Sequence, residues 1–241
     1  HGYRAHHWAA GSATGCNEAC LQMASATEVD ELPASERNQG KRGGRTLLHW
    51  AARNGGEKHV EMLSSCTPVN SRSADGTTPL MLAVYAGHIV VADCLLRRGA
   101  STECENDWGC SCVHWAAMGE DPMHTLPWLL ATERHAATPA SSSLSSEFVR
   151  PQVHGHTSFH KLAQQGRADA ALLVCSLLDG ETILLDRGLR PDAGGRRPSE
   201  IAACAGYDDA AAVLSRLERC VDEAVKLELG RVAACEVWLQ S

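Results

Sequence analysis

The chain has 241 residues, and its 29 acidic side chains outnumber its 22 lysines and arginines, which gives a formal net charge of −7. This balance disfavours a protein that binds nucleic acid regardless of sequence, because such binding depends on a surplus of basic side chains. No apolar run approaches the roughly 18 residues that a membrane-spanning helix needs, so we expect no membrane insertion.

A pattern that starts with glycine recurs along the whole chain. Its clearest copy is GTTPLMLAVYAGHIVVADCLLRRGA, from Gly76 to Ala100. The six copies begin near residues 2, 44, 76, 109, 155 and 195. In four of them a second glycine follows eleven residues after the first. Self-similarity of this kind indicates a solenoid, in which each copy buries its apolar face only against its neighbours.

Each copy predicts two helices joined by a turn. Thr46, Thr78 and Thr157 stand where a hydroxyl can cap the first helix, and Pro79 suits its first position. Pairs of alanines, such as Ala51 and Ala52, keep this helix thin, so that a neighbouring helix can approach closely. A second, amphipathic helix follows the next glycine. Apolar residues recur at i, i+3 and i+4 in Ile89–Leu96, Ala168–Leu178 and Asp208–Leu217.

The spacing of the copies locates three insertions. Two steps between copies have 32 and 33 residues, whereas the other three have 42, 46 and 40. The excess falls between helix pairs, where a solenoid tolerates it best, and it places insertions near 31–43, 131–150 and 179–194. The second insertion contains a Ser-rich segment, Thr138 to Phe148. We expect this segment to be either a flexible surface loop or a contact with a partner.

The end of the chain is too short for another full copy. Asp222–Leu229 and Gly230–Ser241 predict two further helices, so we interpret 219–241 as a degenerate repeat that caps the stack. A single array over 1–241 then accounts for the chain without separate domains. The chain starts at His1, inside a copy and without an initiator Met. We therefore expect any targeting segment to lie outside it.

The recurring residues resemble a known family. The pattern G-x-T-P-L-H-x-A-A-x-x-G-H is typical of the ankyrin repeat, and the third copy keeps Gly76, Thr78, Pro79, Leu80 and Ala83 of it. The resemblance covers roughly residues 1–218. It implies an all-α ankyrin-repeat solenoid of stacked helix-turn-helix units with short connecting fingers. It also implies binding of one or more partner proteins on the concave face, through the finger tips and the exposed edge of the first helix.

The family's pattern further indicates which positions face a partner. They are the residues that flank the first glycine of a copy and the two residues before the second glycine. The partner-binding residues expected from this rule are Arg45, Arg53, Asn54, Asp75, Tyr85, Asp107, Trp108, Met118, His154, His156, Gln164 and Gln165, and the rule also includes Tyr3, Thr77, Cys110 and Arg196. Tyr85, Trp108 and Met118 would form an apolar and aromatic centre, with Arg53 and Asp107 beside it. Trp, Tyr and Arg dominate the binding energy of many interfaces.

A metal site is the main alternative for one stretch of the sequence. Cys110, Cys112 and His114, with Cys104 upstream, are ligand types that zinc accepts. His114, however, occupies the position of the motif histidine, as His49 does, and this position explains it without a metal. The pair His6-His7 has the same explanation. We therefore expect no metal ion and no cofactor.

The remaining cysteines and tryptophans suggest packing. Cys94, Cys175, Cys204 and Cys235 fall within or beside predicted helices, as buried free thiols do, which favours a reducing, intracellular compartment. Either the cytoplasm or the interior of an organelle satisfies this condition. Each of three tryptophans directly follows a motif histidine and is expected to pack inside the array; these are Trp8, Trp50 and Trp115.

These features favour a non-catalytic protein that binds partner proteins. The chain has no G-x-S-x-G, P-loop, dinucleotide or H-E-x-x-H motif, so we expect no enzymatic activity. The leading hypothesis is a scaffold or adaptor. The alternative is an accessory structural subunit of a large multi-protein assembly, such as one in an organelle, to which the polar insertions and the missing start would be suited. A lesser alternative is an ankyrin fragment of a larger enzyme, such as a palmitoyltransferase or a kinase.

Overall fold

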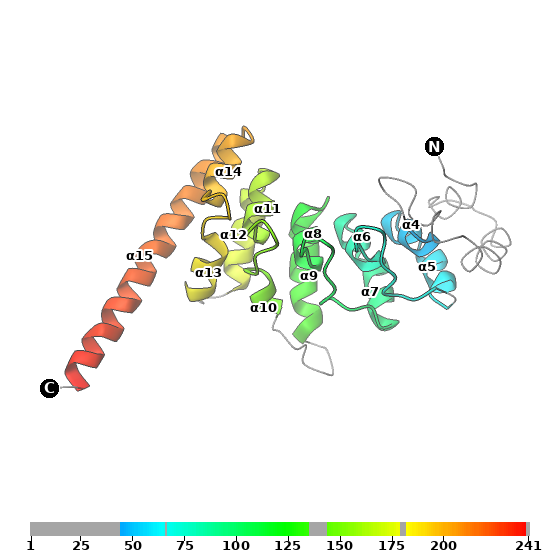
Figure 1. The fold of residues 1–241 in the computed structure, drawn as a ribbon, viewed down its shortest axis with the longest axis horizontal. Helices are drawn as coiled ribbons and strands as arrows, with labels where there is room; N and C mark the ends of the chain where they lie inside the picture. The colour runs from blue at the N-terminus through cyan, green and yellow to red at the C-terminus, as the bar shows by residue number, and fades with distance from the viewer. Residues whose placement is uncertain (1–43, 66, 135–143, 179–181, 240–241) are drawn as a thin grey trace. The chain divides into compact units, whose positions relative to one another are not determined.

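A computed structural model describes residues 44–65, 67–134, 144–178 and 182–239 (Figure 1). The described residues form an all-α fold without a strand, as the sequence predicts. The copy near residue 2, with Tyr3 and Trp8, the insertion at 31–43 and residues 138–143 of the Ser-rich segment lie outside them. The contacts divide the chain into two compact units, His1–Trp128 and Leu129–Ser241, and the boundary falls inside α9 (Pro122–Arg134).

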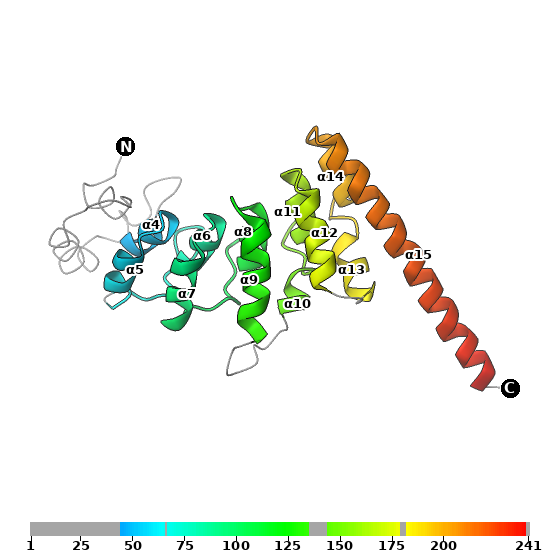
Figure 2. The ribbon, with the colours of Figure 1, turned by 180° about the vertical axis from the view of Figure 1, so that it is seen from behind.

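In the first unit, three short helices lie side by side (Figure 1). They are α4 (Leu47–Arg53), α6 (Pro79–Tyr85) and α8 (Cys112–Met118), and each is the first helix of a predicted copy. The second helices, α5 (Glu57–Leu63) and α7 (Ile89–Arg97), pack against α4 and α6 and against each other (Figure 2). We call the first helix of each copy the inner helix.

Small side chains make the contact between inner helices. Ala51, Ala52, Ala83, Ala116 and Ala117 are all fully buried. An alanine pair lets the backbones of adjacent helices approach closely, and larger apolar side chains fill the space between the two layers of helices. The largest of these in the first unit are Leu48, Leu63, Leu80, Met81, Leu95 and Leu126.

The motif histidine takes part in the cap of three inner helices, α4, α8 and α11, and in α4 it also links the helix to the next copy. Thr46 donates its backbone N–H to Nδ1 of His49 at 3.1 Å. The Nε2 atom of the same ring lies 2.9 Å from the carbonyl oxygen of Thr77, in the following finger. Because Nδ1 accepts, Nε2 carries the proton and donates to that carbonyl. Ser111 with His114, and Thr157 with His160, repeat the first contact.

The second unit contains two more inner helices, α11 (Ser158–Gln164) and α14 (Pro198–Cys204), which pack against each other. The helices that follow them are α12 (Ala168–Leu177) and α15 (Asp208–Leu239). The insertions that the spacing located near 131–150 and 179–194 contribute short helices here, namely α10 (Leu144–Glu147) and α13 (Thr182–Leu189). Helix α13 packs against α11 and α15.

The end of the chain differs from its prediction. Instead of a helix ending near Leu217 and two further helices, one continuous helix of 32 residues, α15, spans 208–239. Side-chain contacts fix it beyond the predicted end. Glu218 accepts from the backbone N–H of Ser199 at 2.9 Å, and Asp222 pairs with Arg197 at 3.0 Å. Gly230 lies inside the helix, where glycine costs only about 1 kcal/mol and does not end a helix by itself.

We predict that replacing Ala83 by Glu destabilises the first unit by roughly 3–5 kcal/mol. Ala83 is fully buried, and a carboxylate there has neither solvent nor a cation to compensate for its charge. Urea denaturation followed by circular dichroism measures this loss. Val90→Glu is the matched control, because Val90 belongs to the second helix of the same copy and is 60% exposed. Equal losses for both variants would contradict the packing described here.

The buried histidines predict that stability falls as the pH drops from about 6.5 to about 4. Burial lowers the pKa of His49 and of His160 to about 4. Between these values the unfolded chain binds protons that the folded chain does not, so the free energy of unfolding decreases with falling pH. Each histidine contributes up to about 3 kcal/mol to this decrease. Urea denaturation across this pH range should show a shallower dependence in His49→Leu than in the unsubstituted chain. An unchanged slope would contradict the neutral, buried histidine.

Candidate partner-binding surface

The C-terminal ends of the inner helices carry a connected group of polar and aromatic side chains. The guanidinium carbon of Arg53 lies 5.1 Å from the ring centroid of Tyr85, a cation–π distance. Tyr85 meets Trp115 edge to face, with 5.7 Å between ring centroids. Arg53 also pairs with Glu120 at 2.9 Å. We call Arg53, Tyr85, Trp115 and Glu120 the helix-end group; it joins three successive copies.

Gly119 allows the chain to pass close to this group. The backbone N–H of Glu120 donates to the carbonyl oxygen of Tyr85 at 2.8 Å. A Cβ atom at Gly119 would stand 2.6 Å from the same oxygen, which is shorter than real contacts allow. The absence of a side chain here therefore lets the turn after α8 hold the Glu120 backbone against α6.

Trp50 and Trp115 were predicted to pack inside the array, but both are half-buried. Trp50 lies under the guanidinium of Arg45, which is 6.0 Å from its ring centroid. The helical period explains this exposure. Trp50 stands three residues before Arg53, and Trp115 three residues before Met118, so each tryptophan lies on the same helix face as an expected binding position. This spacing is the sequence signal that the prediction missed. Glu120 is a further member of the surface that the pattern did not indicate.

The finger tips form a second group around Trp108. The backbone N–H of Asp107 donates to the carbonyl oxygen of Asp75 at 3.0 Å, and the carboxylate of Asp107 lies 3.5 Å from Arg72. Asn106 holds the tip in shape, because its side-chain oxygen accepts from the N–H of Trp108 at 3.1 Å. Trp108 itself is 47% exposed. An exposed tryptophan on a hydrogen-bonded turn presents a large apolar surface that is already ordered.

Two expected binding residues of the first unit are buried instead. Thr77 is 0% and Cys110 4% exposed. Asn54 and Met118 are half-buried.

The expected binding residues of the second unit are only partly available. His154 and Gln165 are exposed, whereas His156 and Gln164 are half-buried. Nε2 of His156 lies 3.0 Å from Asp192, and Arg196, which is exposed, pairs with the same carboxylate at 3.3 Å. Burial opposes the charge of Asp192, but the backbone N–H of Arg196 and the ring of His156 together hold its pKa at about 2. These contacts bind one finger to the next, which makes His156 a structural residue.

In the stretch that was considered for zinc binding, His114 takes part in the cap of α8. Nδ1 of His114 accepts from the backbone N–H of Ser111 at 3.3 Å. Among the residues that the structure describes, no three His, Cys, Asp or Glu side chains converge to hold a metal ion. Cys94, Cys110 and Cys112 are buried, while Cys204, which was expected to be buried, is exposed.

A comparison with known protein families identifies the repeat in part of this arrangement. A family model for the ankyrin repeat matches residues 43–74 and, directly after them, 75–107. The chain contains ankyrin repeats. The two matched repeats hold α4 to α7, and with them Arg45, Arg53, Asp75, Tyr85 and Asp107. Ankyrin repeats are non-catalytic modules that generally mediate protein–protein interaction.

The helix pairs outside the two matched ankyrin repeats begin in the same way. The inner helices α8 and α11 start with the same cap between a hydroxyl residue and the motif histidine, and α14 starts with proline, as α6 does. Within the described part of the chain, no helix is both long enough and apolar enough to cross a bilayer.

We predict that Gly119→Ala lowers the free energy of unfolding by roughly 1–3 kcal/mol. The added methyl group collides with the Tyr85 carbonyl and breaks the hydrogen bond from Glu120. Gly56→Ala is the control, because an added Cβ there meets only the movable ring of His59. Urea denaturation of both variants tests this, and a Gly119→Ala loss no larger than that of the control would refute it.

Proposed function

We propose that this chain is a non-catalytic scaffold that binds a partner protein on the inner-helix and finger face of its ankyrin repeats. The observation that carries the proposal is the helix-end group, which keeps two aromatic rings and a guanidinium half-exposed and fixed in place. Arg53 is held both by the ring of Tyr85 and by Glu120. A surface that is ordered before binding loses little side-chain entropy when a partner covers it.

The chemistry of this surface supports a particular kind of contact. Arginine, tyrosine and tryptophan supply most of the binding energy at protein interfaces, and here they come from three successive copies. Trp108 adds an exposed ring at a finger tip. We infer that the partner buries an apolar side chain against Tyr85 and Trp115 and places an acceptor near Arg53.

A second candidate function is favoured by the two helical insertions. Helices α10 and α13 extend the second unit beyond a regular helix pair, as expected for an accessory structural subunit of a large assembly that needs additional contact surface. The described cysteines are free thiols, which supports a reducing, intracellular compartment for either role. Purification of the chain with one partner favours the scaffold, and purification with many chains at a fixed stoichiometry favours the assembly.

We predict that Trp108→Ala combined with Tyr85→Ala weakens binding to the copurified partner by roughly 2–4 kcal/mol. The variant removes the exposed ring of the finger and the ring that supports Arg53, while the buried core is unchanged. Isothermal titration calorimetry measures the affinity, and circular dichroism checks the helical content. Val90→Ala, on the exposed side of α7, is the control and should bind as the unsubstituted chain does. Unchanged affinity of the double variant would place the interface elsewhere.

A further inference from the structure

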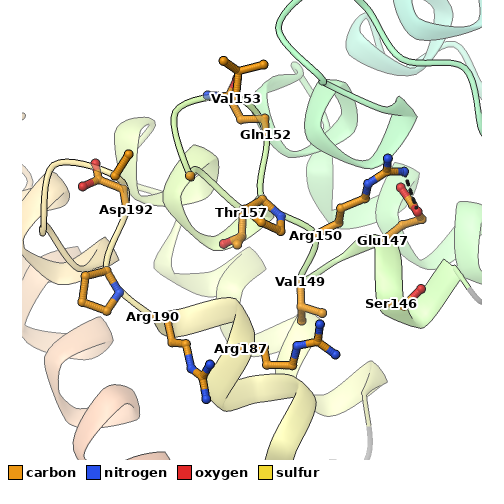
Figure 3. Close-up of a pocket in the computed structure, with 14 residues that line it drawn as sticks. Ser146, Glu147, Val149, Arg150, Gln152, Val153, Thr157, Arg187, Arg190 and Asp192 are labelled. Atoms are coloured by element: carbon orange, nitrogen blue, oxygen red, sulfur yellow. Dashed lines mark hydrogen bonds and ion pairs between the residues drawn. The ribbon is translucent and has the colours of Figure 1, made fainter.

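The second unit contains a groove that belongs to neither the inner helices nor the finger tips alone. Its cavity volume is about 770 Å³, and its walls come from the segment after α10, the finger at 150–157 and the end of α13 with the turn that follows it (Figure 3). Both insertions into the regular repeat spacing therefore contribute to it. The insertions thus add wall residues that the regular repeat spacing does not include.

Two neighbouring residues at the start of α11 hold both walls in place. The hydroxyl of Thr157 donates to the carbonyl oxygen of Gly188 in α13 at 2.6 Å. The hydroxyl of Ser158 donates to the carbonyl oxygen of Phe148, just after α10, at 2.5 Å. Both hydroxyl residues are buried. A Cβ atom at Gly188 would meet the ring of Phe159 at 2.8 Å, so α13 lies directly on the core. The groove is thus formed before any ligand arrives.

Three arginines line the groove. Arg150 pairs with Glu147 at 3.1 Å, and Arg190 pairs with Asp186 at 2.6 Å, which orients both guanidinium groups. Arg187 is exposed, and within the described residues it forms no ion pair or side-chain hydrogen bond. Arg187 lies in the last turn of α13, and Arg190 directly follows the end of this helix.

The two acidic side chains that line the groove, Glu147 and Asp192, would repel a bound anion only weakly. The carboxylate of Asp192 has a side-chain exposure of 1% and accepts from the backbone N–H groups of Gly194 and Arg196 and from the ring of His156. Glu147 has a side-chain exposure of 6% and is compensated by Arg150. The accessible charge is therefore positive, although the chain as a whole has a net charge of −7.

The groove also offers an apolar side. Val149, Pro151, Val153 and Pro191 line it, and Val153 is 68% exposed at its rim. Guanidinium groups beside an apolar strip suit an extended peptide that alternates carboxylate and apolar side chains, because successive side chains of an extended chain point to opposite sides.

We infer that this groove is a docking site for an extended acidic segment of a partner protein, with its carboxylates on Arg187 and Arg190 and an apolar side chain against Val153. The site is independent of the inner-helix surface in the first unit, so a protein bound at one surface does not compete for the residues of the other.

The test uses the full chain and a fluorescein-labelled peptide of about eight residues that alternates glutamate and valine, followed by fluorescence polarisation at low salt. We expect this peptide to bind at least about tenfold more tightly than the same peptide with glutamine in place of glutamate. Equal binding of the two peptides would overturn the proposal. So would an oligothymidylate of similar length that binds more tightly than the acidic peptide, because the groove would then select a nucleic acid.

Matched variants separate this site from general attraction of charge. Arg187→Glu with Arg190→Glu should weaken the acidic peptide about tenfold or more. Arg216→Glu with Arg219→Glu makes the same change of charge at two exposed arginines with the same spacing on α15, and it should alter binding by less than about twofold. Equal effects of the two pairs would overturn the inference. Val153→Asp, which leaves every arginine in place, should also weaken binding, and unchanged affinity in this variant would contradict the assigned groove.

Discussion

The close contact between neighbouring inner helices is the constraint on which the first unit depends. Ala51, Ala83 and Ala116 are fully buried, and their small volume lets α4, α6 and α8 lie side by side. This distance also sets the reach of the motif histidine, since His49 spans from its own cap to the carbonyl of Thr77 in the next finger. A larger side chain at these positions would remove the packing and the hydrogen bond together.

The same contact produces the candidate binding surface. Because adjacent inner helices lie close together, side chains at their ends also come into contact. Arg53, Tyr85 and Trp115 therefore interact across three copies. None of these residues could form the group within its own copy. The surface is consequently a property of the stack, and its rigidity derives from the buried alanines beneath it.

Local chemistry was predictable from the sequence wherever one residue determines the backbone. Gly44, Gly76 and Gly109 adopt positive φ angles, which glycine alone tolerates easily, and Thr78 caps α6 through a hydrogen bond to Met81. The inner helices and most of their buried faces follow from these signals. Exposure along the fingers was harder to predict, because Thr77 and Trp108 both flank a glycine, yet Thr77 is buried and Trp108 is exposed.

Features that depend on contacts between distant residues could not be predicted in this way. The length of α15 depends on Glu218 and Asp222 meeting Ser199 and Arg197, and no pattern within 208–239 indicates these partners. The groove arises similarly, from Thr157 and Ser158 holding two insertions whose own sequences specify no common surface.

The two candidate surfaces place arginine in different environments within an acidic chain. In the first unit, Arg53 is neutralised by Glu120 and lies over Tyr85, so it contributes direction and apolar contact more than net charge. In the groove, Arg187 forms no ion pair among the described residues, and the nearby acids are paired with other groups. Under the two proposals, the first surface would select a partner mainly by aromatic contact, whereas the groove would select one mainly by charge. The two surfaces share no residue, so each proposal can be tested with variants that leave the other surface unchanged.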